Sequence, residues 1–427
     1  MELAQRLAAL VGAPVTDLQR MLGGASRQTW SFSAGGRDLV ARCDPPGAPR
    51  GGTMAREATL LRAAGKAGIP VPEVVAGTDD LLVMQRLHGE AIARRILRDE
   101  AFAGARERLP AQCADALARL HTNVPPEQVP GLPAADDPLG TTRDLLDSFG
   151  EPHPAFELGL LRLARTRPRP TGRCVVHGDF RLGNLMVDGD GLVGILDWEL
   201  AHIGDPAEDL GWLCVRSWRF GGPRPVAGLG TRQALLSSYA AAGGAVIDEA
   251  TLRWWEAFGT LRWGVICMQQ AAAHLSGAVR SVELAAIGRR TCEVELDLLD
   301  LIAPSTVGTT DTPRPEPGPL AGPHDRPTAG QLVEAVREWV GGLALHGQDA
   351  FLARVANNVL RIVERELALG PGLARRHTGR LAGLGVADDA ELAAQVRAGR
   401  DDEATIAAVR AHVVDKLTVA DPRQLRR

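Results

Sequence analysis

The sequence predicts an α+β protein with two lobes, one small and strand-rich and one mostly helical, followed by a separate all-helical domain. Residues 28–87 carry strand patterns around one helical stretch, and helical periodicity dominates residues 89–302. Residues 303–327 are rich in proline, glycine and threonine without periodicity, as expected of a linker. The predicted parts are therefore an N-lobe (1–88), a helical lobe (89–302), a linker (303–327) and a bundle of four or five amphipathic helices (328–427).

The N-lobe is predicted element by element. Residues 1–22 are typical of a helix that leads into a strand. Residues 28–43 alternate around Ala-Gly-Gly and predict a β-hairpin. Residues 54–68 predict a helix with glycines near its end, and residues 69–87 predict two strands around an Asp-Asp turn.

The helical lobe contains three short strand patterns among its helices. Residues 107–123 place apolar side chains on one helix face. Short strands are predicted over residues 174–179, 184–189 and 192–198. The apolar, aromatic stretch 251–277 is interrupted by charges, which indicates a core helix and not a membrane span.

Composition excludes several classes of protein. The chain has 427 residues, 45% of them hydrophobic and 23% charged, which rules out wholesale disorder. The net charge of −4 argues against a nucleic-acid-binding surface spread over the chain. Only two lysines occur, Lys66 and Lys416. No glycine-rich loop ends in Lys-Ser or Lys-Thr, so a P-loop nucleotidase is not expected, and neither lysine has the context of a Schiff-base enzyme.

Cysteine usage and hydropathy indicate the compartment. The six cysteines are scattered and form no C-x-x-C pair, which argues against a cysteine zinc site or a disulfide framework and favours a reducing cytosol. No apolar run approaches the ~20 residues that a membrane helix needs. The sequence therefore predicts a cytoplasmic protein with neither a membrane nor a nucleic acid as partner.

The strongest chemical signal lies in VVHGDFRLGNLMV and GILDWEL, which contain His177, Asp179, Asn184 and Asp197. In phosphoryl transfer one carboxylate orients the acceptor hydroxyl, while an amide oxygen and a second carboxylate hold Mg²⁺ against the nucleotide. The pattern H-x-D-x-x-x-x-N, followed thirteen residues later by Asp, matches the catalytic and metal-binding loops of kinases. The alternative interpretation is an acid-rich turn between strands.

At these residues the chain resembles the aminoglycoside phosphotransferase-like family. HGD, DWE and the following GDPAEDLGWL (204–213) are forms typical of that family, and the resemblance covers about residues 20–302. It is similar to the subgroup of phosphotransferase domains associated with acyl-CoA dehydrogenases, on segments such as WLCVRSWRFG and RSVELAAIGRR. The tail resembles an uncharacterised helical domain attached to such kinases. The resemblance implies a protein-kinase-like fold.

The resemblance also implies roles for the motif residues. Asp179 corresponds to the catalytic base, and Asn184 and Asp197 to the ligands of Mg²⁺. His177 belongs to the same catalytic loop, which it would hold by hydrogen bonding. A purely structural histidine is the alternative for His177. The implied cofactors are Mg²⁺ and ATP.

The N-lobe would then clamp the nucleotide. Arg42 occupies the strand position where kinases carry lysine, and Glu57 on the following helix is its expected partner. A guanidinium grips phosphate oxygens in a bidentate manner, although its geometry differs from that of an ammonium. The loop LGGASRQ would cover the phosphates, with the hydroxyl of Ser26 assisting. The backbone of Gln85 to Leu87 would meet the purine edge, and because backbone groups read the purine, GTP is not excluded.

The acceptor site should lie over Asp179. Arg181, Arg216, Trp218 and Arg219 are the candidates to line it. The RSWR cluster could bind an anionic group such as a phosphate of coenzyme A. A solvated loop with a packed tryptophan is the alternative. A basic cluster argues mildly against aminoglycosides, which are polycations.

Together these features predict an enzyme that moves the γ-phosphate of Mg-ATP to a hydroxyl of a small molecule. The subgroup resemblance suggests a hydroxyacyl-CoA as that acceptor. Two alternatives remain: a nucleotide-binding pseudokinase or scaffold that acts through the helical tail, and an antibiotic kinase of the aminoglycoside type. The tail offers no chemistry of its own, and formation of a homodimer is one role that it could have.

Overall fold

The computed structural model describes residues 3–21, 27–44, 53–305 and 327–426. Ser26 and most of the predicted linker therefore lie outside the described residues. The chain divides into two compact units, each formed by two stretches of sequence. Unit 1 comprises Met1–Asp136 and Pro168–Glu256, and unit 2 comprises Asp137–Arg167 and Ala257–Arg427.

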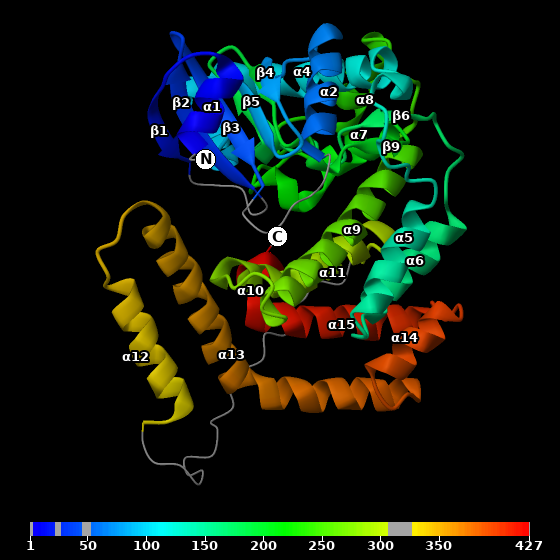
Figure 1. Ribbon diagram of the computed structural model, residues 1–427. Coiled ribbons are helices and arrows are strands. Elements are labelled where there is room, and N and C mark those ends of the chain that lie inside the picture. Colours follow the sequence, from blue (N-terminus) through cyan, green and yellow to red (C-terminus); the bar gives the residue numbers. More distant parts are fainter. Residues whose placement is uncertain (1–2, 22–26, 45–52, 306–326, 427) are drawn as a thin grey trace. The chain divides into compact units, whose positions relative to one another are not determined.

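Unit 1 begins with a five-stranded antiparallel sheet in the order β1-β2-β3-β5-β4 (Figure 1). Its strands are β1 (Val15–Arg20), β2 (Gln28–Ala34), β3 (Arg37–Cys43), β4 (Val74–Gly77) and β5 (Leu81–Gln85). The predicted hairpin is confirmed, and it turns at Gly35 and Gly36, whose φ angles of 58° and 71° suit a tight hairpin turn.

Helix α1 (Leu3–Val11) contributes Leu7 to the core of this sheet. The buried side chains of Phe32, Leu39, Leu81 and Val83 complete that core. Helix α2 (Thr53–Lys66) packs on β4 and β5 and carries the one acidic residue that it buries, Glu57, toward β3.

The rest of unit 1 is helical, with two short antiparallel ladders that carry the motif. β6 (Cys174–Val176) pairs with β9 (His202–Gly204), and β7 (Leu185–Val187) pairs with β8 (Leu192–Ile195). The helices are α3 (Ala93–Arg98), α4 (Ala103–Asn123), α7 (Ala207–Cys214), α8 (Arg232–Ala241) and the start of α9 (Glu249–Leu275). Short 3-10 helices lie at η3 (Leu182–Asn184), η4 (Trp198–Leu200) and η5 (Arg216–Arg219).

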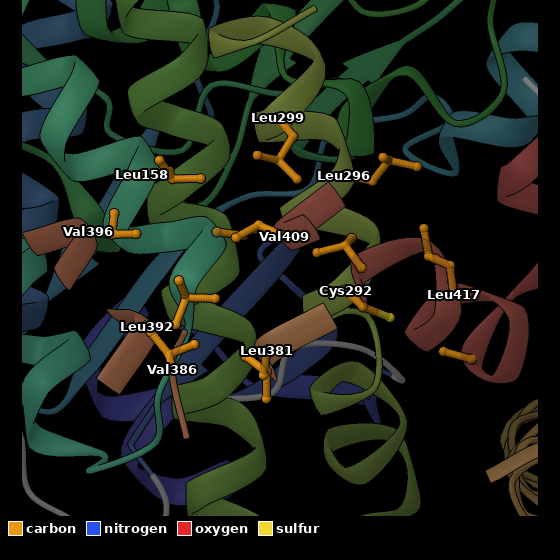
Figure 2. Close-up of a cluster of buried hydrophobic side chains, with 13 residues drawn as sticks. Leu158, Cys292, Leu296, Leu299, Leu381, Val386, Leu392, Val396, Val409 and Leu417 are labelled. Atoms are coloured by element: carbon orange, nitrogen blue, oxygen red, sulfur yellow. The ribbon is translucent and has the colours of Figure 1, made fainter. Parts of the chain in front are cut away.

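Unit 2 is helical throughout its described residues. Besides the end of α9 it contains α5 (Pro138–Ser148), α6 (Pro154–Arg165), α10 (Val282–Gly288), α11 (Thr291–Ile302), α12 (Ala329–Gly341), α13 (Gly347–Leu384), α14 (Asp389–Arg397) and α15 (Glu403–Ala420). Figure 2 shows the core in which side chains of α6 and α11, such as Leu158 and Leu299, converge with Leu392 and Val409 from the tail. The tail helices therefore bury their apolar faces against α6 and α11.

The predicted fold class is confirmed: a small β-sheet region, a mostly helical remainder and a helical C-terminal region. Within the described residues, no helix combines the length and the apolar character that crossing a bilayer requires.

Candidate active site

The HGD motif forms a tight loop directly after β6. Gly178 has a φ of 76°, and a Cβ built there would lie 2.4 Å from the carbonyl oxygen of Leu200. Only glycine fits this position, because a side chain would collide with backbone. The loop therefore presses against the chain that leads into β9.

His177 is fully buried and ties the loop to its neighbours. Its Nδ1 accepts a hydrogen bond from the backbone N–H of Asp179 (3.2 Å), so its Nε2 donates to the carbonyl oxygen of Leu196 (3.0 Å). Since both ring nitrogens are engaged within the protein, this geometry supports the loop-holding role expected of His177.

Asp209 on α7 clamps the same loop from the other side. Its Oδ2 accepts the backbone N–H of His177 (2.7 Å), and its Oδ1 accepts that of Gly178 (2.9 Å). His121 Nε2 lies 3.2 Å from Oδ2, and His121 Nδ1 lies 2.8 Å from the hydroxyl of Tyr239. Burial raises the pKa of Asp209, but the hydrogen bond and charge of His121 and the contacts with His177 outweigh burial, and the net pKa is lowered.

Asp179, the candidate base, is 9% exposed and fixed by three side chains. Its Oδ1 accepts from Trp212 Nε1 (2.9 Å), and its Oδ2 accepts from Asn184 Nδ2 (2.6 Å). Arg181 Nε lies 3.0 Å from Oδ1, and the Arg181 guanidinium carbon lies 4.7 Å from the centroid of the Trp218 ring. The carboxylate is thus held in one orientation with a cation beside it.

Asn184 and Asp197, the candidate metal ligands, are joined through the backbone. The carbonyl of Asn184 accepts a hydrogen bond from the N–H of Leu196 (2.8 Å), the residue before Asp197. Asn184 Nδ2 bonds to Asp179, so its amide oxygen remains for a cation. Asp197 has a φ of 65°, an uncommon backbone conformation for a non-glycine residue that often marks functional sites.

These two residues fit Mg²⁺ in their chemistry. Mg²⁺ prefers one or two carboxylates or other oxygen donors and keeps water and phosphate oxygens as its remaining ligands. The Asp197 side chain is 38% exposed, so it is accessible to a hydrated ion.

Glu57 holds two arginines at the candidate nucleotide site. Its Oε1 lies 2.5 Å from Arg42 Nη1, as predicted, and its Oε2 lies 2.5 Å from Arg27 Nη1. Arg42 also reaches Asp197, with Nη2 3.1 Å from Oδ1. Burial lowers the pKa of Arg42, but the charges of Glu57 and Asp197 outweigh burial and raise its net pKa. One guanidinium thus connects the sheet, α2 and the loop that carries Asp197.

The predicted purine-contact segment follows β5. The N–H of Gln85 donates to the carbonyl of Glu73 (2.8 Å), and the N–H of Arg86 donates to that of Asp38 (3.0 Å). A purine contact therefore depends on the remaining backbone groups of the segment, including those of Leu87.

The structure separates the four candidate acceptor residues. Arg181 lies beside Asp179 and over Trp218, which is buried. Arg219 Nη2 lies 2.9 Å from Glu256 Oε1 and 3.0 Å from the carbonyl of Cys214, and Arg232 shares the same carboxylate, so Arg219 is held within the fold. Arg216, half-buried in the same 3-10 turn, is the remaining basic candidate.

Two residues of the candidate site, Arg27 and Trp212, were not predicted from the sequence. Arg27 is 6% exposed and pairs with Glu57 thirty residues away, a contact for which no local pattern is a signal. Trp212 donates to Asp179 from α7; its place in GDPAEDLGWL marks the segment but gives no hint of this bond.

The strand-rich lobe, the HGD loop and the paired loop that ends in Asp197 together define a protein-kinase-like phosphotransferase. The chain belongs to the phosphotransferase enzyme family (APH), which it matches over residues 17–255. Residues 343–424 match a domain of unknown function, DUF6285.

Curated relatives agree with this assignment. Acyl-CoA dehydrogenase family member 10 of Mus musculus is 27% identical over 232 residues, which cover 50% of this chain and 22% of that protein. Acyl-CoA dehydrogenase family member 11 of Homo sapiens is 28% identical over 204 residues, or 44% of this chain and 26% of that protein. The chain spans about a quarter of the length of these relatives.

Solved structures show the same fold. A candidate aminoglycoside phosphotransferase from Ralstonia eutropha JMP134 superposes with a TM-score of 0.54 at 20% identity, covering 68% of this chain and 93% of that one. The GDP complex of aminoglycoside 2'-phosphotransferase-IIIa gives a TM-score of 0.50 at 14% identity, covering 70% and 99%. The predicted family, fold and enzyme class, a small-molecule phosphotransferase, are confirmed.

Proposed function

We propose that the protein transfers the γ-phosphoryl group of Mg-ATP to a hydroxyl of a small molecule in the cytoplasm. One observation carries this proposal: Asp179 is oriented by Trp212 and Asn184, and the backbone carbonyl of Asn184 accepts a hydrogen bond from Leu196, the residue before Asp197. The candidate base and both candidate ligands thus belong to one connected group, as phosphoryl transfer requires.

In the proposed reaction Asp179 accepts the hydrogen bond of the acceptor hydroxyl and takes its proton as the oxygen attacks phosphorus. Arg181, beside Asp179, balances negative charge near the attacking oxygen. Arg42, held by Glu57, would contact the phosphates of the nucleotide. Asn184 and Asp197 would hold Mg²⁺, which when bound offsets the charge of the phosphate groups.

For the acceptor we propose a hydroxyacyl-CoA. The named relatives are acyl-CoA dehydrogenase family members, and this chain covers about a quarter of their length. Arg181, beside Asp179, and Arg216, in the same 3-10 turn as Arg219, are the candidates to contact an anionic coenzyme A phosphate. An aminoglycoside acceptor is the alternative, and it would need an acidic surface in place of these arginines.

A pseudokinase is the second candidate, favoured by one contact. Arg42 already occupies Asp197 Oδ1 at 3.1 Å, so a cation must compete with a guanidinium for this carboxylate. In this case the helical tail would carry the function, as a scaffold or through a homodimer. The mass of the chain in solution, with and without residues 326–427, gives its oligomeric state. If the oligomeric state is the same in both, the tail does not mediate dimerisation.

Calorimetry tests whether the metal-dependent nucleotide site that the kinase requires is present. ATP and GTP are titrated with and without Mg²⁺ into the wild type and Asp197→Ala. We expect Mg²⁺-dependent binding that Asp197→Ala removes, because this substitution deletes the carboxylate ligand. Absence of binding under every condition would reject the kinase and favour the scaffold.

Acceptors are then screened by coupled detection of nucleoside diphosphate. Hydroxyacyl-CoAs of varied chain length and hydroxyl position are compared with their parent hydroxy acids and with aminoglycosides. Turnover that requires the coenzyme A portion supports the proposed acceptor. If nucleotide binds but only aminoglycosides are phosphorylated, the proposed phosphotransferase activity is supported and the hydroxyacyl-CoA acceptor is rejected.

A further inference from the structure

We propose that unit 2 binds a divalent transition-metal ion between His377, Asp389 and His412. These residues come from three helices, α13, α14 and α15, and all three lie within the DUF6285 match. No step of the proposed phosphoryl transfer uses them, so the inference is independent of that function.

The separations of the three side chains suit a single ion. Asp389 Oδ2 lies 3.0 Å from His377 Nε2 and 3.9 Å from His412 Nε2. One ligand atom from each residue lies within 4.8 Å of the other two. Metal bonds of about 2.0–2.1 Å at tetrahedral angles separate ligand atoms by roughly 3.3 Å. The observed distances lie on either side of that value, so small side-chain shifts bring all three onto one ion.

Three buried polar atoms of this cluster have no hydrogen-bond partner among the described residues. Asp389 Oδ1 and the Nδ1 atoms of His377 and His412 are buried, and none has a hydrogen-bond partner among the residues that the structure describes. The two imidazole rings stack with centroids 3.6 Å apart and planes inclined by 18°. Buried polar atoms without partners are rare in folded proteins. If Asp389 binds an ion through both oxygens, Oδ1 gains a partner, whereas ligation through the two Nε2 atoms leaves the Nδ1 atoms as they are.

The cationic side chains next to the site are each paired with a carboxylate, Arg380 with Asp415 and Lys416 with Glu295. Lys416 follows His412 by one helical turn, but it forms an ion pair with the buried Glu295 of α11. Its positive charge is therefore balanced next to the site. Asp389 supplies a carboxylate to offset part of the charge of the incoming ion.

A cavity provides access to the cluster. Both histidines line a cavity of about 680 Å³ in unit 2, together with apolar side chains such as Met268, Leu275 and Leu373. Three protein ligands leave a fourth position of a tetrahedral ion for water or for a ligand in this cavity. Imidazole with carboxylate, without thiolate, suits Zn²⁺ and related first-row ions better than Ca²⁺ or Mg²⁺.

The test uses Co²⁺ as a spectroscopic probe and Zn²⁺ as competitor on the full chain. Asp197→Ala serves as the parent, because it removes the other predicted cation ligand. We expect one equivalent of Co²⁺ to produce visible d–d bands, and Zn²⁺ to displace it. Asp389→Asn and His412→Phe should each weaken Co²⁺ binding by at least about tenfold.

His346→Gln is the matched control, because His346 is an exposed histidine of the same unit. It should leave the Co²⁺ spectrum and affinity unchanged. Asp389→Asn is nearly isosteric, so it keeps the test decisive if His412→Phe fails to fold. The proposal is overturned if the parent shows no bands, or if Asp389→Asn binds Co²⁺ as the parent does. Neither result bears on phosphoryl transfer, which calorimetry with nucleotide measures separately.

Discussion

Two aspartates, one in each unit, bond to histidines in contrasting ways. Asp209 of unit 1 accepts two backbone N–H groups and lies next to His121, so its two oxygens are both occupied. Asp389 of unit 2 bonds to His377 through Oδ2, while its buried Oδ1 lacks a partner in the described part of the chain. The first arrangement is complete without a ligand and serves to position a loop. The second leaves a buried oxygen without a partner among the described residues, and this is the site where we propose that a metal ion binds.

The largest effect on turnover is expected at Asp179, because it lies in the loop that Asp209 positions. Asp179→Asn removes the proton acceptor, and we expect turnover to fall by about 100- to 10,000-fold while Mg-ATP still binds. Steady-state rates and calorimetry measure the two quantities on the same preparation. Turnover that survives the substitution would exclude Asp179 as the base.

Asp209→Asn tests whether the hydrogen bonds between Asp209 and the HGD loop stabilise unit 1 and support turnover. The substitution turns an amide NH₂ toward buried backbone N–H donors, so we expect unit 1 to lose about 3 kcal/mol of unfolding free energy. Turnover should fall with it as the loop loosens. Urea unfolding and steady-state rates provide the measurements.

Asp136→Asn is the matched control for Asp209→Asn. Asp136 pairs with Arg173 on the surface, where its side chain is 71% exposed. Surface ion pairs contribute little, so this variant should stay within about 1 kcal/mol of the wild type. Equal losses in the two variants would contradict the distinction between a buried clamp and a surface pair.

Glu295→Gln addresses the charge next to the incomplete cluster. Burial raises the pKa of Glu295, but Lys416 and His153 outweigh burial and lower it to about 2, from an ordinary value of 4.5. The depressed pKa corresponds to at most about 3 kcal/mol of stability. This contribution is present above pH 4.5 and is lost as the pH falls toward 2.

We therefore expect Glu295→Gln to destabilise unit 2 at pH 7 and to match the wild type near pH 2, without changing turnover. Urea unfolding as a function of pH checks this. Glu366→Gln is the control: Glu366 pairs with Arg289 at the surface, with 54% of its side chain exposed, and should change stability by less than about 1 kcal/mol. A loss of turnover in Glu295→Gln would show that charge in unit 2 acts on catalysis.

Local spacing explains what the sequence predicted well. The hairpin over 28–43 and the set of His177, Asp179 and Asn184 are fixed by neighbours within a few residues, so their pattern is visible in the sequence. The fold class and the family rest on the same patterns. The pairing of Arg42 with Glu57 was also predicted, from the family resemblance.

Long-range partnership explains what the sequence could not show. Arg27 meets Glu57 only after the sheet and α2 have packed, and the contact of His412 with Asp389 requires α14 and α15 to pack together. In the tail, α13 continues through Pro371 to Leu384, although proline often ends a helix. The structure has four tail helices among the described residues, within the predicted four or five.

Gly178 restricts which amino-acid substitutions the HGD motif can accept during evolution. Because any side chain at position 178 would strike the carbonyl of Leu200, every amino-acid substitution there would displace the neighbouring Asp179, the candidate base. A shift from His-Gly-Asp to the His-Arg-Asp form of protein kinases would first need the chain before β9 to retreat. Each step of such a route would pass through a poorly active protein, so a saturation library selected for turnover should return glycine at this position.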